Sequence, residues 1–179
     1  MTQFNSMQAV KRKFFALRNG IIADTIRKAG ANYKIIFGLN MPQLIEIAES
    51  IGHNPQLADD LWNNKSTRES MLLAPMLMDP ATLSRETASL WATQAPTTEV
   101  SDILCHRLLR HTPYALELAK ELASHPDPAV RYTAIRLLFN LLPTSKNIAR
   151  DICQKEIDRQ SNQTKAIATR LLDELDFFE

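Results

Sequence analysis

The stretch HPDPAVRYTAIRLLFNLL, residues 125–142, decides the fold of this chain. Asp127 can accept a hydrogen bond from a free backbone N–H of a first helical turn, and Pro128 at the first helical position sacrifices no hydrogen bond. Apolar residues then recur at spacings of three and four, which places one apolar stripe along a helix. The stripe consists of Val130, Ala134, Leu137, Leu138 and Leu141. The stretch therefore predicts a helix with one buried face and with Arg131 and Arg136 on its other faces.

The pattern Asp-Pro-x-Val-Arg, followed three residues later by Ala, resembles the second helix of a HEAT repeat, a helical hairpin that stacks on its neighbours. A second pattern supports a repeat, because LADDL at residues 57–61 recurs as LAKEL at residues 118–122. A single hairpin cannot bury its own apolar face, so several must stack. The resemblance implies an all-α fold, namely an α-α superhelix (solenoid) of HEAT-like helical hairpins.

Composition agrees with an all-helical chain. The 179 residues are 45% hydrophobic and 23% charged, which is enough to bury a core as one domain. Only four glycines are present, and most of the nine prolines stand where helices are expected to begin. Few turns of the kind that β-hairpins require are therefore available.

We predict a single HEAT-like repeat domain over residues 1–179, with three N-terminal helices followed by four helical hairpins. The N-terminal helices are expected around Phe4 to Leu17, from about Ile21 to Ala29, and after a cap at Asn40. The first helices of the hairpins are expected at 54–64, 80–95, 113–124 and 145–160, and the second helices at 65–77, 97–111, 128–142 and 162–172. The expected caps within the hairpins are Ser66, Asp79, Thr112 and Asp127.

Charge separates between these two sets of helices. The second helices hold eight Lys and Arg residues against three acidic ones, the first helices hold six against eight, and the whole chain carries only +1. The basic residues of the second helices are Lys65, Arg68, Arg107, Arg110, Arg131, Arg136, Lys165 and Arg170. A basic lining with an acidic outer wall is typical of a groove for a polyanion. The alternative is an ordinary solvated face, because these boundaries exclude the acidic residues after residue 172.

Several classes of protein are not expected. No run approaches the ~18 apolar residues of a membrane span, and Lys11, Arg12 and Lys13 interrupt the N-terminal pattern, so we expect a cytoplasmic protein without a membrane partner. Cys105 and Cys153 lack the spacing of metal ligands, and no glycine-rich phosphate loop is present. We therefore expect neither a metal nor a cofactor.

Residues 33–77 resemble the DNA alkylation repair family of HEAT-like alkylpurine DNA glycosylases. The resemblance rests on the aromatic-Gly-x-x-x-Pro-x-Leu segment at 37–44, the Leu-Ala-x-x-Leu-Trp helix at 57–62, and the helix start Arg68-Glu69. It continues, with decreasing clarity, to residue 142. It implies a basic concave face that holds duplex DNA and an activity that removes alkylated purines such as 3-methyladenine and 7-methylguanine.

The catalytic motif implied by the resemblance is degenerate in this chain. The family pattern is Trp-Asp-x-x-Asp, whose last carboxylate stabilises the oxocarbenium-like sugar, and its best counterpart here is SDILC at 101–105. Asp102 matches the first Asp, whereas Ser101 replaces the Trp and Cys105 replaces the catalytic Asp. We assign no catalytic residue and keep Asp102 as a candidate, either alone or paired with His106 four residues later.

Three functions remain open on the sequence. The first is a DNA-binding HEAT-like protein with weak or lost alkylpurine excision, and the sequence favours a protein that is not an enzyme. The second is a protein-interaction scaffold with a protein partner and no DNA role, and the third is an active alkylpurine DNA glycosylase that uses Asp102. Arg131 matches the phosphate-contacting arginine of the family. The candidate nucleic-acid-binding residues are Arg68, Arg107, Arg131, Tyr132 and Arg136.

Overall fold

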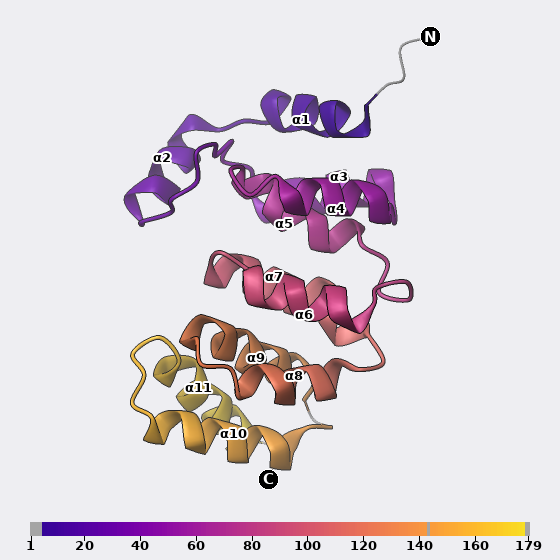
Figure 1. The fold of residues 1–179 in the computed structure, drawn as a ribbon. Helices are drawn as coiled ribbons and strands as arrows, with labels where there is room; N and C mark the ends of the chain where they lie inside the picture. The colour runs from indigo at the N-terminus through magenta and orange to yellow at the C-terminus, as the bar shows by residue number, and fades with distance from the viewer. Residues whose placement is uncertain (1–4, 143, 178–179) are drawn as a thin grey trace. The chain divides into compact units, whose positions relative to one another are not determined.

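The computed structural model describes residues 5–142 and 144–177, and every regular element in these ranges is a helix (Figure 1). The all-α prediction is confirmed, because the described ranges contain eleven α-helices and no named strand. Phe4, expected in the first helix, lies outside the described residues.

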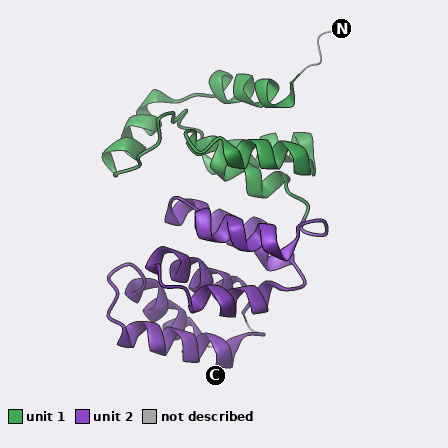
Figure 2. Ribbon diagram, viewed as in Figure 1, with its two compact units in different colours: residues 1–79 green, residues 80–179 purple. Residues whose placement is uncertain are grey.

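The chain divides after Asp79 into two compact units (Figure 2). Unit 1 contains α1 (Ser6–Ala16), α2 (Gly20–Lys28), α3 (Met41–Ile51), α4 (Pro55–Asn63) and α5 (Arg68–Leu77). Unit 2 contains α6 (Arg85–Gln94), α7 (Thr98–Arg107), the 3-10 turn η1 (Leu109–His111), α8 (Ala115–Ala123), α9 (Pro128–Asn140), α10 (Lys146–Asp158) and α11 (Lys165–Asp176). The expected single domain stays a prediction.

Unit 1 is organised around the α4–α5 hairpin, with α3 against α5 and α1 against α4. The segment that leads into α3 is tied to the start of α5, because the N–H of Ile35 donates to Ser66 (2.9 Å) and the N–H of Arg68 donates to Ile35 (3.1 Å). Asn40 and Gln43 then form a reciprocal capping box that begins α3.

Gly38 allows the same segment to approach the start of α2. Its φ of +79° lies in the left-handed region, and an added Cβ would collide with the backbone oxygen of Asn19 and lie 2.8 Å from the backbone nitrogen of Ala23. The N–H of Asn19 donates to the carbonyl of Phe37 at 2.8 Å, which holds the two backbones together. A side chain at this position would therefore separate α2 from the segment.

Unit 2 consists of three helical hairpins, α6–α7, α8–α9 and α10–α11. Their second helices are neighbours, because α9 contacts both α7 and α11, while the first helices α6 and α8 contact each other. Each interface is filled by small and branched apolar residues; Leu104, Ala134 and Leu171 are fully buried on the three second helices. Unit 2 therefore presents one surface made mainly by second helices.

The structure corrects three of the four expected hairpin caps. Asp127 caps α9 as predicted, accepting from the N–H of Ala129 at 2.9 Å. The N-cap residue of α5 is Thr67 rather than Ser66, and α6 begins after Ser84 rather than Asp79. Thr112 does not cap α8; its hydroxyl donates to the carbonyl of Leu109 instead, and the helix begins after Tyr114, which has no side-chain cap bond.

Candidate nucleic-acid interface

A polar cluster joins α7 and α9 at the surface of the second helices of unit 2. The phenol of Tyr132 donates to Oδ1 of Asp102 at 2.9 Å, and Nε of Arg136 lies 3.1 Å from the same oxygen. Tyr132 and Arg136 are four residues apart on α9, so both reach the same neighbour on α7. The one carboxylate that matches the family motif is thus already engaged by a hydroxyl and a guanidinium.

The cluster continues toward the C-terminal ends of the same helices. Nδ1 of His106 lies 3.0 Å from Oδ1 of Asn140, and Nη1 of Arg110 lies 3.3 Å from that nitrogen. The tautomer of His106 decides which of these contacts is a hydrogen bond. Asp102 and His106 therefore contact different residues of α9. These contacts do not pair the two side chains with each other, as their spacing had suggested.

Aromatic and cationic side chains extend the surface to α11. The guanidinium of Arg136 lies 5.6 Å from the ring centre of Phe139, and that of Arg170 lies 6.0 Å from it. Nε of Arg107 is buried and has no hydrogen-bond partner among the described residues. We call the following set the α7–α9–α11 surface: Asp102, His106, Arg107, Arg110, Tyr132, Arg136, Phe139, Asn140 and Arg170. This set contains four arginines and one carboxylate. Glu99 acts on Asp102 as a neighbouring negative charge, and α11 extends to Asp176, so it includes the acidic residues after residue 172 that the sequence-based boundaries had excluded.

A pocket of about 310 Å³ adjoins this surface, where α7 and α9 begin. Pro96, Thr98, Ser101, Tyr132 and Gln163 are among the residues that line it. The pocket leaves the ring of Tyr132 accessible to a bound molecule, although its hydroxyl is bonded to Asp102.

The charge state of Asp102 reflects partial burial. Burial raises the pKa of this carboxyl, the Arg136 charge and the Tyr132 hydrogen bond lower it, and the balance leaves it above the ordinary value. Burial and the neighbouring Asp102 likewise raise the pKa of the Tyr132 phenol, so that it remains a hydrogen-bond donor at neutral pH.

Asp102→Asn is expected to leave the free energy of unfolding unchanged, or to raise it by no more than about 1 kcal/mol, at neutral pH. Because the folded-state pKa is raised, ionisation of Asp102 is less favourable in the folded chain than in the unfolded chain, and stability is lost as pH rises through that pKa. The amide keeps an acceptor for Tyr132. Urea unfolding at neutral and at acid pH measures the effect, which should shrink at acid pH. A matched control is Asp173→Asn, which removes an exposed carboxylate from α11.

Ser101 and Cys105, at the degenerate motif positions, are buried between α7 and α9. Cys105 is fully buried, with Sγ 3.5 Å from the carbonyl of Thr133, and the hydroxyl of Ser101 accepts from that of Thr133 at 3.0 Å. Burial and the negative charge of Asp102 raise the pKa of the Cys105 thiol, which therefore stays protonated. A carboxylate introduced at position 105 would lie inside the helix interface and not on the surface.

Arg68 and Arg131 are held by protein acceptors. Nη1 of Arg68 donates to the carbonyl of Leu39 (3.2 Å) and to Glu69 (3.1 Å). Nε of Arg131 donates to both carboxylate oxygens of Glu156 (3.0 Å each) on α10. Their exposed fractions are only 6% and 8%, so a phosphate would have to displace these partners. Their expected role in nucleic-acid binding stays a prediction.

The two candidate arginines of α9 have different partners within unit 2: Arg131 pairs with Glu156 on α10, whereas Arg136 pairs with Asp102 on α7. Sequence reasoning also missed Glu156, His106 with Asn140, and Phe139 as parts of these clusters. Nothing in a single sequence pairs residues of different helices, although Phe139 stands three residues after Arg136 on α9 and was detectable from that spacing.

Comparison with known proteins agrees with this architecture. The described residues form HEAT-like helical hairpins, and in unit 2 four arginines gather on the α7–α9–α11 surface. A family model described as "DNA alkylation repair enzyme" matches residues 10–178, and the chain belongs to this family.

One solved structure has the same fold, with a TM-score of 0.81 over 93% of this chain and 74% of the other, at 18% sequence identity. It is described as "a new family of proteins related to the HEAT-like repeat DNA glycosylases with affinity for branched DNA structures". No curated protein matches the chain.

Among the residues that the structure describes, no helix is sufficiently long and apolar to cross a membrane. No group of three or more His, Cys, Asp or Glu side chains among them is arranged to hold a metal ion.

Proposed function

We propose that this chain binds DNA through the α7–α9–α11 surface and excises alkylated purines weakly or not at all. One observation carries the proposal: the surface holds four arginines, whereas Cys105, at the position of the family's catalytic carboxylate, is buried and protonated. Membership of the DNA alkylation repair family supports DNA as the polyanion. The affinity of the similar protein for branched DNA suggests that branched as well as linear duplexes should be tested.

The surface is suited to contacts with phosphates. Arg110 and Arg170 are exposed, and partly buried Arg107 and Arg136 flank them, so several guanidiniums can meet one sugar–phosphate backbone. Asp102 offers little repulsion, because Arg136 lies against it. The exposed edge of Tyr132 is available beside these charges for contact with a sugar or a base.

The same arrangement is poor for excision. Stabilising a cationic sugar needs a carboxylate that faces the DNA, and removing such a group costs about 3–4 kcal/mol, each 1.36 kcal/mol being about tenfold in rate. Cys105 supplies no charge, and that of Asp102 is shared with Arg136 and Tyr132. A cationic lesion that already leaves readily is the substrate on which residual activity is tested.

DNA affinity is expected to fall steeply with salt. Each lost phosphate contact should reduce the slope of log affinity against log salt concentration by about 0.9, so Arg110→Ala and Arg170→Ala should each show a smaller slope than the wild type. Fluorescence anisotropy with linear and four-way-branched duplexes measures it. Arg85→Ala on α6 is the matched control, because Arg85 is an exposed arginine of a first helix and should leave the slope unchanged. If the protein bound neither duplex even at low salt, the proposal that it binds DNA would be wrong.

Wild-type protein is expected to release little or no 7-methylguanine from alkylated duplex DNA. Chromatography of the free base, corrected for spontaneous loss in protein-free DNA, provides the measurement. Robust release that Asp102→Asn abolishes would instead establish an active glycosylase that uses Asp102.

A further inference from the structure

A groove lies on the other side of unit 2, between the first helices α8 and α10. α8 contacts α6 and α9 most closely, whereas α10 contacts α9 and α11, and a cavity of about 450 Å³ opens between them. Its principal lining residues are Lys120, Ala123, Ile148, Ile152, Lys155 and Arg159. We call it the α8–α10 groove. None of its lining residues belongs to the α7–α9–α11 surface.

The groove has an apolar floor that follows one face of α10. Ile148, Ile152, Lys155 and Arg159 are separated by four, three and four residues, which is the spacing of one helix face. The two isoleucines are only partly buried, so they retain apolar surface that a ligand can cover. Ala123 supplies the opposite wall from the last turn of α8.

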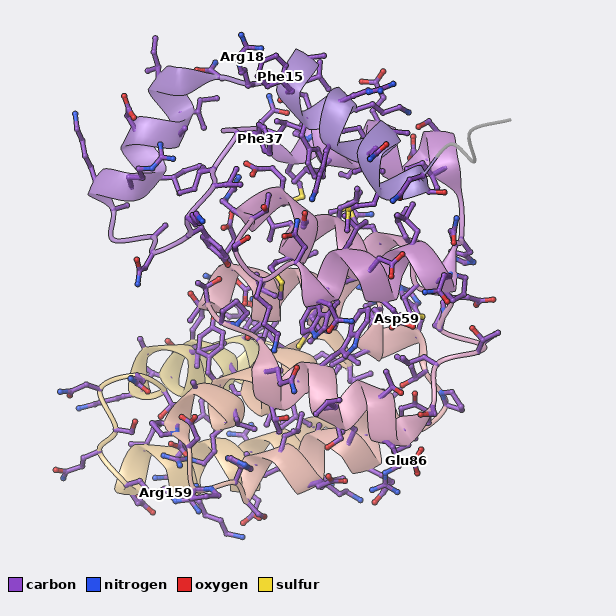
Figure 3. All side chains as sticks on the ribbon, turned by 45° about the horizontal axis from the view of Figure 1, so that its top comes forward. Phe15, Arg18, Phe37, Asp59, Glu86 and Arg159 are labelled. Atoms are coloured by element: carbon purple, nitrogen blue, oxygen red, sulfur yellow. The ribbon has the colours of Figure 1, made fainter. Side chains whose placement is uncertain are left out.

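Arg159 closes one end of the groove. It follows α10 directly, and Figure 3 labels it at that end of the helix. Its Nη1 donates to the carbonyl of Ala123 (3.4 Å) and to the buried carboxylate of Glu156 (2.8 Å). This side chain therefore bridges α8 and α10 and keeps a positive charge at the rim.

Cations dominate the rim. Lys120, Lys155 and Arg159 stand against the single acid Asp151 among the lining residues. Lys120 pairs with Glu117 at 2.8 Å and Lys155 with Asp151 at 2.7 Å, but the members of both pairs are well exposed. Water screens such pairs, so an incoming carboxylate can replace either acidic partner at little cost.

We propose that the α8–α10 groove binds an acidic amphipathic helix of a partner protein. Such a helix would place two or three apolar side chains on Ile148 and Ile152 and direct its carboxylates to the rim cations. Residues 148–159 extend over about 16 Å, which matches about three turns of a bound helix. DNA fits less well, because its phosphates would meet the cations but leave the isoleucines without an apolar partner.

The test uses a fluorescently labelled peptide of about 14 residues with leucines at helical spacing and glutamates between them. Its control has the same composition with the leucines dispersed, so that no stripe forms. Anisotropy titrations should show at least about tenfold tighter binding of the amphipathic peptide, and Lys155→Glu and Ile152→Thr should each weaken it by about tenfold or more. Lys155 is exposed, so that variant keeps its fold even if the Ile152 variant does not.

The matched control variant is Lys165→Glu on α11, which reverses the same charge outside the groove. It should leave peptide affinity unchanged, and an excess of duplex DNA should not displace the peptide. Equal binding of both peptides, displacement by DNA, insensitivity to Lys155→Glu, or no binding of the amphipathic peptide would each overturn the proposal. Failure of the peptide to bind leaves the DNA proposal standing, because that proposal is tested by variants on other helices. Displacement by DNA would instead place DNA in the groove, and the salt slopes of Arg110→Ala and Arg170→Ala would then show whether the α7–α9–α11 surface also binds it.

Discussion

Arg131→Ala is expected to lower the free energy of unfolding by about 3–5 kcal/mol, because it removes one partner of a buried ion pair. Glu156 is only 2% exposed and would keep only the hydrogen bonds from Thr164 (2.6 Å) and Arg159 (2.8 Å). The variant also loses the bonds from Nη1 to the carbonyls of His125 (3.0 Å) and Pro126 (2.7 Å), which hold the turn before α9. Urea unfolding followed by circular dichroism measures the loss.

Two variants test whether loss of the Arg131–Glu156 ion pair causes the lower free energy of unfolding. Arg170→Ala, which removes an exposed arginine from α11, should change stability by no more than about 0.5 kcal/mol. Arg131→Met combined with Glu156→Leu should recover much of the loss, because no uncompensated charge then remains buried. A loss in Arg131→Ala no larger than that of the Arg170 control would contradict the structural role.

The pH dependence of stability provides an independent check on the same pair. Burial acts to raise the pKa of Glu156, but hydrogen bonds from Thr164, Arg159 and Arg131 outweigh it and hold the pKa below its ordinary value. A lowered carboxyl pKa stabilises the fold above the ordinary value, and this contribution is lost as pH falls through the lowered pKa. The stability advantage of the wild type over Arg131→Ala should therefore shrink at acid pH.

The salt dependence of DNA binding distinguishes a phosphate-contacting role of Arg131 from a purely structural one. A phosphate-contacting arginine, as the family resemblance implies, would make the salt slope of Arg131→Ala smaller by about 0.9. The ion pair with Glu156 instead favours an unchanged slope, measured at a temperature at which the variant is still folded.

Most helices could be predicted from the sequence because apolar spacing and capping depend on residues within one helix. The apolar spacing of residues 128–141 and the cap at Asp127 depend on one helix and its first turn, and both were correct. The expected starts at Asp79 and Thr112 were wrong: the Thr112 hydroxyl donates to the carbonyl of Leu109 instead. A tertiary contact joins the two turns, because the phenol of Tyr114 donates to the carbonyl of Leu83 at 2.6 Å. No single helix contains that information.

The candidate site was less predictable, since motif matching identifies residue types and not directions. Arg131 and Arg136 are five residues apart, which separates them by about 140° around a helix, and this spacing already indicated two different neighbours. Ser101 and Cys105 likewise belong, with Val100 and Leu104, to the buried face of α7. The partner of Arg131, in contrast, is 25 residues away on another helix and could not be inferred from spacing.

The segment that carries the family resemblance has a structural explanation in unit 1. Fully buried Glu69 accepts hydrogen bonds from the backbone N–H groups of Phe37 (3.0 Å), Gly38 (2.9 Å) and Leu39 (3.4 Å). Arg68 lies beside it, with Nη1 at 3.1 Å. The aromatic-Gly segment and the Arg-Glu helix start therefore belong to one hydrogen-bond network that joins the segment before α3 to α5.

Glu69→Ala is accordingly expected to lower the free energy of unfolding by about 3–5 kcal/mol, because it leaves buried backbone donors and the Arg68 charge without their acceptor. Glu49→Ala, on the exposed side of α3, is the matched control and should change stability by no more than about 0.5 kcal/mol. Urea unfolding gives the stability difference, and hydrogen exchange locates it. The amides of Phe37, Gly38 and Leu39 should lose protection in Glu69→Ala alone, so unchanged protection there would show that other contacts hold the segment.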